Sequence, residues 1–549
     1  MTGWRWITAA VLAGILAMPA AADDAERAVA TAHPLATDAA EGVLAEGGNA
    51  FDAAVAASAA LAVVEPTGSG LGGGGFWLLH DAGATRSVMV DGRETAPARA
   101  TETMYQAPPT EAYDEPSLNG PLAAGIPGEP AALAHIAETY GQLSLARSLA
   151  PAIKLAREGF RVDDEYRDKA RFRREVLMRY PASRRLFLDD GQIPEAGWRL
   201  RQPELARTLE RLAEQGRSGF YRGKTAARLI SAVQEAGGIW QRKDLHDYAI
   251  VEREPVTFDY RDYQITAASL PSAGGVGLAT MLGILEGVDR GAIERTGWVH
   301  WQVEAMRRAY RDRARHLGDP DFTQAPVERL TSRAYAEALR SAIDPDEATP
   351  SKALNKAKRG RDTTHFSIVD AQGNRVAATL SINYPFGSGF VAEGTGVVLN
   401  DEMNDFATDP GEPNAYGLVG GEANAIRPGK RPLSSMTPTF VEGPDRTAVL
   451  GTPGGSRIIT MVLLGILEFT DGGDADAMVS RPRYHHQYLP DVIEHEPGAF
   501  PTALRRQLRQ RGHELKVTDR RFGDMQVIVR DRDTAEAEAA SDPRGRAGD

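Results

Sequence analysis

The sequence predicts a mixed α/β protein, and three stretches carry that prediction. Residues 363–369 and 375–383 alternate between apolar and polar side chains on either side of the turn-rich segment 370–374, which is typical of a β-hairpin. Residues 49–66 (NAFDAAVAASAALAVVEP) are apolar on nearly every face and indicate a buried helix. Residues 125–264 favour further helices joined by Gly and Pro turns. One chain is therefore expected to combine strands with covering helices.

The predicted hairpin places a few polar side chains on one face. If the five-residue loop is symmetric, Thr363 lies directly opposite Ser381, and Asn383 follows one step further along the same face. Side chains that face each other in an antiparallel pair have Cβ atoms about 4.5–5.5 Å apart. The register therefore predicts contact between the hydroxyl groups of Thr363 and Ser381.

A threonine at the first position of a strand permits one specific chemistry. Thr363 follows a basic, apparently unstructured stretch, residues 351–361 (SKALNKAKRGR). If the chain is cut before Thr363, its hydroxyl and its new α-amino group belong to one residue. An α-amino group has a reference pKa of about 7.7–8.0, so it can accept the hydroxyl proton near neutral pH. Because threonine is also common in ordinary strands, the spacing alone leaves both interpretations open.

Composition limits the class of protein. The 549 residues are enough for a large core and more than one domain. The formal net charge of −12 disfavours nucleic acid or an anionic membrane surface as the main partner. The chain has no cysteine, which excludes disulfides, thiolate nucleophiles and zinc–thiolate sites.

The first 22 residues predict a secretory signal peptide. Arg5 supplies the positive charge, residues 6–18 form an apolar run, and residues 20–22 (AAA) provide a small-residue cleavage site. The apolar run is too short for a membrane anchor, which needs about 20 residues. We therefore expect an exported protein, periplasmic or secreted, with no membrane contact after removal of the signal.

Several motifs along the chain share a resemblance to one family. In chain order they are GGNAFDAAVAASAALAVVEP, SGLGGGGF, TTHFSIVDAQGN, NYPFGSG, LNDEMNDF, RPLSSMTPTF and PGGSRIIT. Together they resemble the γ-glutamyltransferase family of N-terminal nucleophile hydrolases. The resemblance implies a four-layer αββα sandwich, made as one precursor and cut into a large subunit, residues 23–362, and a small subunit, residues 363–549.

The resemblance also implies which residues carry the chemistry. Thr363 matches the nucleophile that attacks the γ-carbonyl of the substrate. The turn 453–457 matches the segment whose Gly454 and Gly455 amides form an oxyanion hole, a role that unshielded backbone amides suit. The hairpin register adds Ser381, whose hydroxyl is expected to orient that of Thr363.

Two clamps are implied for the α-amino acid end of the substrate. Arg93, in DGRETAP, matches the arginine that binds the α-carboxylate, since a guanidinium fork suits a carboxylate. Ser434 and Ser435 complete that site. The loop 409–421 resembles a lid in which Tyr416 covers the pocket. The residues that match the binding site for the α-ammonium group are Asn383, Glu402 and Asp405.

The implied reaction transfers a γ-glutamyl group from glutathione or a related compound, through an ester on Thr363, to water or to an amino acid or peptide. No cofactor or metal is expected, and the partner is the protein's own second subunit. Two alternatives remain: a glutaryl or cephalosporin acylase of the same fold, and a catalytically silent periplasmic protein that binds γ-glutamyl peptides.

Two further stretches carry structural expectations. The Arg-rich residues 300–316 predict an amphipathic helix whose charges lie on a solvated face with ion pairs. The polar end, residues 531–549, is expected to fray.

Overall fold

The computed structural model describes residues 26–546 except 107–114, 352–362, 410 and 520. The predicted signal peptide and most of the basic stretch before Thr363 lie outside the described residues. Within the described part, no helix has the length and apolar character needed to cross a bilayer.

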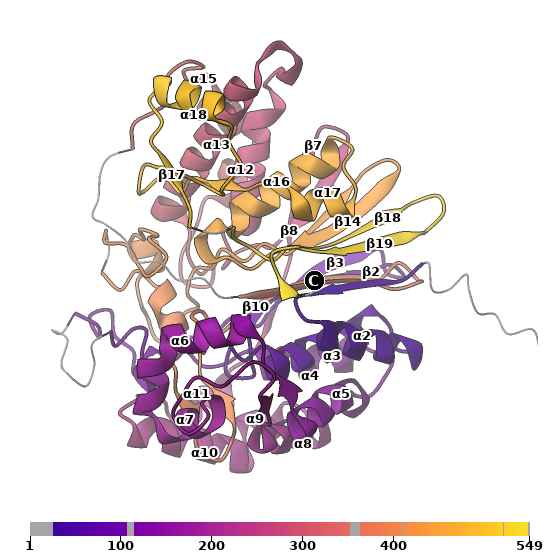
Figure 1. Ribbon diagram of the computed structural model, residues 1–549, viewed down its shortest axis with the longest axis vertical. Coiled ribbons are helices and arrows are strands. Elements are labelled where there is room, and N and C mark those ends of the chain that lie inside the picture. Colours follow the sequence, from indigo (N-terminus) through magenta and orange to yellow (C-terminus); the bar gives the residue numbers. More distant parts are fainter. Residues whose placement is uncertain (1–25, 107–114, 352–362, 410, 520, 547–549) are drawn as a thin grey trace, which may run out of the picture.

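Two six-stranded antiparallel sheets pack against each other between two helical layers, as Figure 1 shows. The first sheet has the order β1 (Ala28–Thr31), β9 (Thr364–Val369), β10 (Arg375–Ser381), β2 (Gly74–Asp81), β3 (Arg86–Asp91), β6 (Val251–Arg253). The second has the order β19 (Ala537–Ser541), β18 (Gln526–Asp531), β14 (Arg446–Gly451), β13 (Thr439–Glu442), β8 (Tyr263–Ala267), β7 (Val256–Tyr260). The expected αββα arrangement is confirmed.

The two helical layers come from successive parts of the chain (Figure 1). On the side of the first sheet lie α2 (Pro34–Ala45), α3 (Ala50–Val64), α4 (Glu129–Thr139), α5 (Leu145–Glu158), α6 (Asp164–Arg179), α7 (Pro181–Phe187), α8 (Pro203–Gln215), α9 (Ser218–Tyr221), α10 (Gly223–Glu235) and α11 (Arg242–Asp247). On the side of the second lie α12 (Gly274–Glu286), α13 (Arg295–His316), α14 (Val327–Leu330), α15 (Arg333–Ser341), α16 (Ile458–Thr470), α17 (Ala475–Ser480) and α18 (Thr502–Gln510).

The buried helix forms as predicted, and its start is capped from both sides. The Asn49 side chain accepts the backbone N–H of Asp52 at 3.0 Å, and the Asp52 carboxylate accepts that of Asn49 at 3.0 Å. Such a reciprocal box satisfies donors that a helix start leaves unpaired. Every residue of α3 is buried, and the helix packs on β9 and β10.

The hairpin has the predicted register. Thr379 pairs with His365 and Leu380 with Thr364, so one further step places Thr363 opposite Ser381. The hairpin lies inside the first sheet, because β9 also pairs with β1 and β10 with β2. Its polar face meets the second sheet, where Ser367 Oγ donates to the backbone oxygen of Gln526 at 3.1 Å.

Three sequence-based expectations are wrong in detail. Residues 125–264 also contain strands, of which β6 and β7 each extend one of the two sheets. The charges of α13 do not all face solvent, because Glu304, Arg307, Arg308 and Arg313 are buried. The polar C-terminal part does not fray within the described residues, since β19 completes the second sheet and later arginines form ion pairs with Glu496 and Glu65.

The contact between the sheets leaves no room for a side chain at Gly451. A Cβ at this position would lie 2.2 Å from Cε1 of His365. The His365 ring is held by Thr379 Oγ1 at 2.9 Å and Ser367 Oγ at 3.3 Å, and burial lowers the pKa of His365 to about 3. The neutral imidazole therefore fills the space that Gly451 leaves open.

We expect Gly451→Ala to lower the free energy of unfolding by about 1–3 kcal/mol, because overpacking forces the ring or the strand to shift. Gly42→Ala in α2 is the matched control: a Cβ there has no atom within 4 Å, and alanine should stabilise the helix by about 0.5–1 kcal/mol. Thermal unfolding followed by circular dichroism measures both. Equal melting temperatures for wild type and Gly451→Ala would contradict the close contact.

Candidate active site

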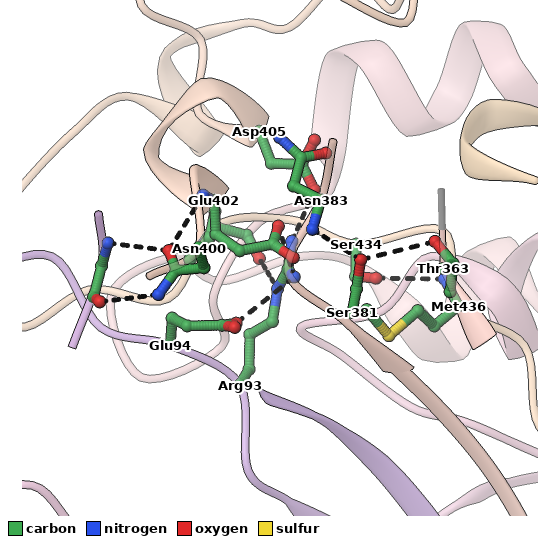
Figure 2. Close-up of polar contacts among 12 residues, drawn as sticks. Arg93, Glu94, Thr363, Ser381, Asn383, Asn400, Glu402, Asp405, Ser434 and Met436 are labelled. Carbon is green, nitrogen blue, oxygen red and sulfur yellow. Dashed lines mark hydrogen bonds and ion pairs between the residues drawn. The ribbon is translucent and has the colours of Figure 1, made fainter. Parts of the chain in front are cut away.

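The predicted nucleophile and its neighbour meet at the end of the hairpin. Thr363 Oγ1 lies 3.4 Å from Ser381 Oγ, as drawn in Figure 2. Ser381 Oγ accepts the backbone N–H of Asn383 at 2.8 Å. Either hydroxyl can be the donor in the contact between Thr363 and Ser381. Thr363 is 8 % exposed and lines the adjoining cavity.

A cavity adjoins Thr363. It contains every predicted site residue except Arg93 and Gly454. Its lining consists of Arg313, Thr363, Ser381, Asn383, Glu402, Asp405, Tyr416, Leu418, Ser434, Ser435, Met436, Gly455, Ser456 and Ile458. Segments from both subunits expected after cleavage therefore form one pocket.

Arg93 lies behind this cavity, on the loop that follows β3, and contacts three acids. Its guanidinium is 2.7 Å from Glu402 Oε2, 2.5 Å from Asp405 Oδ2 and 3.4 Å from Glu94 Oε2 (Figure 2). Burial disfavours its charge, but the carboxylates of Glu402, Glu94 and Asp405 outweigh that effect and raise the pKa of Arg93. The arginine thus holds the acidic side of the pocket together.

The acids in and beside the pocket are strongly affected by burial. Burial raises the pKa of Asp401 to about 8, and it raises the pKa values of Glu402 and Glu94 despite the nearby Arg93. The ion pair of Glu402 with Arg93 is close but not aligned as a hydrogen bond, and within the described part neither carboxylate oxygen of Glu402 accepts one. Glu402 therefore keeps acceptor capacity for a cationic group entering the pocket.

Ser434 and Ser435 differ in whether their hydroxyl groups are hydrogen-bonded. Ser434 Oγ accepts the backbone N–H of Met436 at 3.0 Å, and Ser434 is fixed by a bridge to Ser272. Ser435 Oγ is buried and has no hydrogen-bond partner among the described residues. A hydroxyl in that position is ready to bind a ligand, because leaving it unpaired is costly.

The glycine turn before α16 adopts conformations that favour glycine. Gly454 has φ 143° and Gly455 has φ 56°. A Cβ at Gly455 would lie 2.4 Å from Cδ1 of Tyr416, so the aromatic ring packs directly on this turn. The Tyr416 hydroxyl donates to the backbone oxygen of Asn383 at 2.9 Å. Tyr416 thereby links its loop to the hairpin end and to the glycine turn.

Comparison with known proteins agrees with this arrangement. The profile of the family described as Gamma-glutamyltranspeptidase matches residues 36–549. The chain is 40% identical over 528 residues to the "Glutathione hydrolase proenzyme" of Escherichia coli (strain K12), covering 94% of this chain and 90% of that protein. The chain belongs to the gamma-glutamyltranspeptidase family.

Solved structures show the same fold. The cephalosporin acylase from Bacillus halodurans superposes with a TM-score of 0.80 at 28% identity, over 93% of this chain and 95% of that one. The Helicobacter pylori gamma-glutamyltranspeptidase matches with a TM-score of 0.56 at 37% identity, over 58% of this chain and 92% of that one. The protein therefore has the fold of the N-terminal nucleophile hydrolases.

Three charged residues around the pocket of this family member escaped the sequence analysis. Glu94 and Asp401 are adjacent in sequence to Arg93 and Glu402, so their motifs already contained them. The sequence pattern was misleading for Arg313, because it belongs to an Arg-rich helix whose charged side chains were predicted to face solvent. Its burial depends on how α13 packs.

One buried group outside the pocket has the composition of a metal site. His300, Glu304 and His513 offer ligand atoms within 4.8 Å of one another. Glu304 Oε2 is 2.5 Å from Arg308, and its Oε1 is 3.1 Å from Arg307. Two guanidinium groups already neutralise this carboxylate, so we interpret the group as structural.

The contact between Thr363 and Ser381 generates a prediction. Ser381→Ala should lower kcat for a γ-glutamyl anilide by roughly 3- to 10-fold, which corresponds to one neutral hydrogen bond, with a smaller effect on KM. Ser381→Thr keeps the hydroxyl and a strand-compatible side chain, so its kcat should stay close to wild type. Steady-state kinetics on purified, folded variants measure this. An unchanged kcat in Ser381→Ala would remove Ser381 from the mechanism.

Proposed function

We propose that the protein is an exported, self-processing γ-glutamyltransferase and glutathione hydrolase. The observation that carries this proposal is the single pocket in which Thr363 and Ser381 face an acidic group made by Glu402 and Asp405. A hydroxyl nucleophile at one end and paired carboxylates at the other fit a substrate with a reacting carbonyl and a distant ammonium group.

The α-amino group of Thr363 would act as the base once the preceding bond is cut. It would take the hydroxyl proton as Oγ1 attacks the γ-carbonyl carbon, and the N–H groups of Gly454 and Gly455 would stabilise the oxyanion. The leaving amine would depart with that proton and leave a γ-glutamyl ester on Thr363. Water or the amine of an amino acid or peptide would then attack the ester, which yields glutamate or a new γ-glutamyl amide.

Substrate recognition would use both sides of the pocket. Glu402 and Asp405, aided by Asn383, would hold the α-ammonium, and the free acceptor capacity of Glu402 supports this role. The α-carboxylate would lie toward Ser435, whose hydroxyl is unpaired among the described residues, with Ser434 and Arg93 nearby. Tyr416 would cover the bound substrate, since it already joins Asn383 to the glycine turn.

The subunits would be a large chain, residues 23–362, and a small chain, residues 363–549, that remain together as a heterodimer. The sheets support this assembly, because β9 and β10 of the small chain lie between β1 and β2 of the large chain. Removal of residues 1–22 would accompany export to the periplasm or medium.

A glutaryl or cephalosporin acylase is the second candidate, and the likeness to the Bacillus halodurans cephalosporin acylase favours it. A glutaryl side chain has no α-ammonium, however, so the buried Glu402 and the partly exposed Asp405 would have no cationic group of such a substrate to bind. A silent binding protein is disfavoured by the contact between Thr363 and Ser381, which binding alone does not need.

Processing can be tested at the nucleophile. Purified wild type should show two chains, and N-terminal sequencing of the smaller should begin Thr-Thr-His-Phe-Ser. Thr363→Ala should remain one inactive precursor, because it lacks the hydroxyl that attacks the preceding bond. If Thr363→Ala still splits at the same position, cleavage by this residue is wrong.

The ammonium clamp can be tested with matched donors. Asp405→Asn should raise KM for a γ-glutamyl anilide by the equivalent of about 2–5 kcal/mol, because the amide cannot balance the charge of the bound ammonium. A glutaryl anilide, which lacks only the ammonium, should change much less, so the preference between the two donors narrows. Asp445→Asn, on an exposed turn, is the control. A wild type that already prefers the glutaryl anilide would favour the acylase.

A further inference from the structure

Arg313 is a buried cation in the pocket with almost no partner. It projects from α13, is 6 % exposed, and lines the same cavity as Thr363 and Asp405. Its one hydrogen bond to the described residues runs from Nη2 to the backbone oxygen of Leu433, at 3.5 Å, and its Nε has no partner there. No described carboxylate lies within ion-pair distance of Arg313, so most of its five N–H donors are unused.

Several other buried arginines are neutralised by carboxylates, whereas Arg173 donates to the backbone oxygens of Pro385 at 3.1 Å and Gly387 at 2.8 Å. Arg93 contacts three carboxylates, Arg457 pairs with Glu494 at 2.6 Å, and Arg308 pairs with Glu304 at 2.5 Å. A buried guanidinium stays charged and is costly without a counter-charge. An unpaired guanidinium that opens into a cavity is therefore suited to an anionic ligand.

The free groups of the pocket divide into two kinds. Among the described residues, Arg313 makes one hydrogen bond, to Leu433, and its Nε has no partner, while the hydroxyl of Ser435, two residues after Leu433, has none. The unused acceptors are the carboxylate oxygens of Glu402. The charge of Arg93 is already balanced, because its guanidinium contacts the carboxylates of Glu94, Glu402 and Asp405. Arg93 also does not line the cavity.

We infer that Arg313 is a substrate-binding residue that takes a carboxylate of the substrate. This inference rests on the proposed γ-glutamyltransferase function and adds to it a contact between the Arg313 guanidinium and a substrate carboxylate. Two carboxylates of a γ-glutamyl peptide are available: the α-carboxylate of the glutamyl group and the C-terminal carboxylate of the leaving peptide. A planar guanidinium with several free N–H groups can bind either one bidentately.

Pairs of substrates that differ by a single carboxylate show which of the two carboxylates Arg313 binds. We would compare γ-glutamyl p-nitroanilide with 4-aminobutanoyl p-nitroanilide, which lacks only the α-carboxylate, and glutathione with its C-terminal amide. The variants are Arg313→Met and Arg313→Lys, and Arg315→Met on the exposed side of the same helix is the control. Two chains on a gel and an unchanged melting temperature would show that each variant is folded. If Arg313→Met does not mature, Arg313→Lys, which keeps the charge but loses the fork, provides the comparison.

If Arg313 binds the α-carboxylate, Arg313→Met should raise KM for γ-glutamyl p-nitroanilide by about 30-fold or more, with Arg313→Lys intermediate. The aminobutanoyl compound should change by less than about twofold, because it never made the contact. If Arg313 binds the leaving peptide, the same loss should appear only for glutathione relative to its amide. Equal losses for all four donors, or none, would overturn the inference. A wild type that releases no chromophore from the γ-glutamyl anilide would instead refute the proposed function, and with it this inference.

Discussion

Antiparallel pairing between β9 and β10 is the constraint on which the active site depends. The pairing places Thr363 opposite Ser381 and starts the turn that contains Asn383. A shift of one residue would turn every side chain of a strand to the opposite face. The register is held because the apolar face packs on α3 and the polar face meets the second sheet through Ser367 and His365. The same strand pairing therefore positions both the core side chains and Thr363, the predicted nucleophile.

Charge balance is the second organising feature of the pocket. Arg93 is surrounded by Glu94, Glu402 and Asp405, an arrangement that keeps several acids close together in a buried place. Burial still raises the pKa values of Glu402 and Asp401, so the acidic side of the pocket is under-compensated. Arg313, which lines the same pocket, lacks a carboxylate partner among the described residues. The pocket thus combines an under-compensated acidic group with a guanidinium that has no carboxylate partner among the described residues, and a zwitterionic substrate end would satisfy both.

Short sequence patterns correctly predicted the helices and strands that depend mainly on interactions between neighbouring residues. The Asn49 cap, the almost wholly apolar helix after it and the alternating hairpin were all visible in sequence, because capping and period-two alternation depend on neighbouring residues. The same reasoning failed for α13, whose arginines read as a solvated face. Arg307, Arg308 and Arg313 are buried because other segments cover the helix, and helical periodicity does not report which segments those are. Strands β6 and β7 were missed for a similar reason, since short strands join a sheet only through distant partners.

The sequence by itself determined the hairpin register and the family to which the chain belongs, and it predicted Thr363 as the reacting residue, because these depend on local alternation and on ordered motifs. Only the tertiary structure decided how the charges are distributed. It placed Arg93 behind Glu402 and Asp405 and brought Arg313, 50 positions before Thr363 in the chain, into the pocket. Electrostatic energy depends on distance and on exclusion of water, and both are set by packing between segments that are remote in sequence.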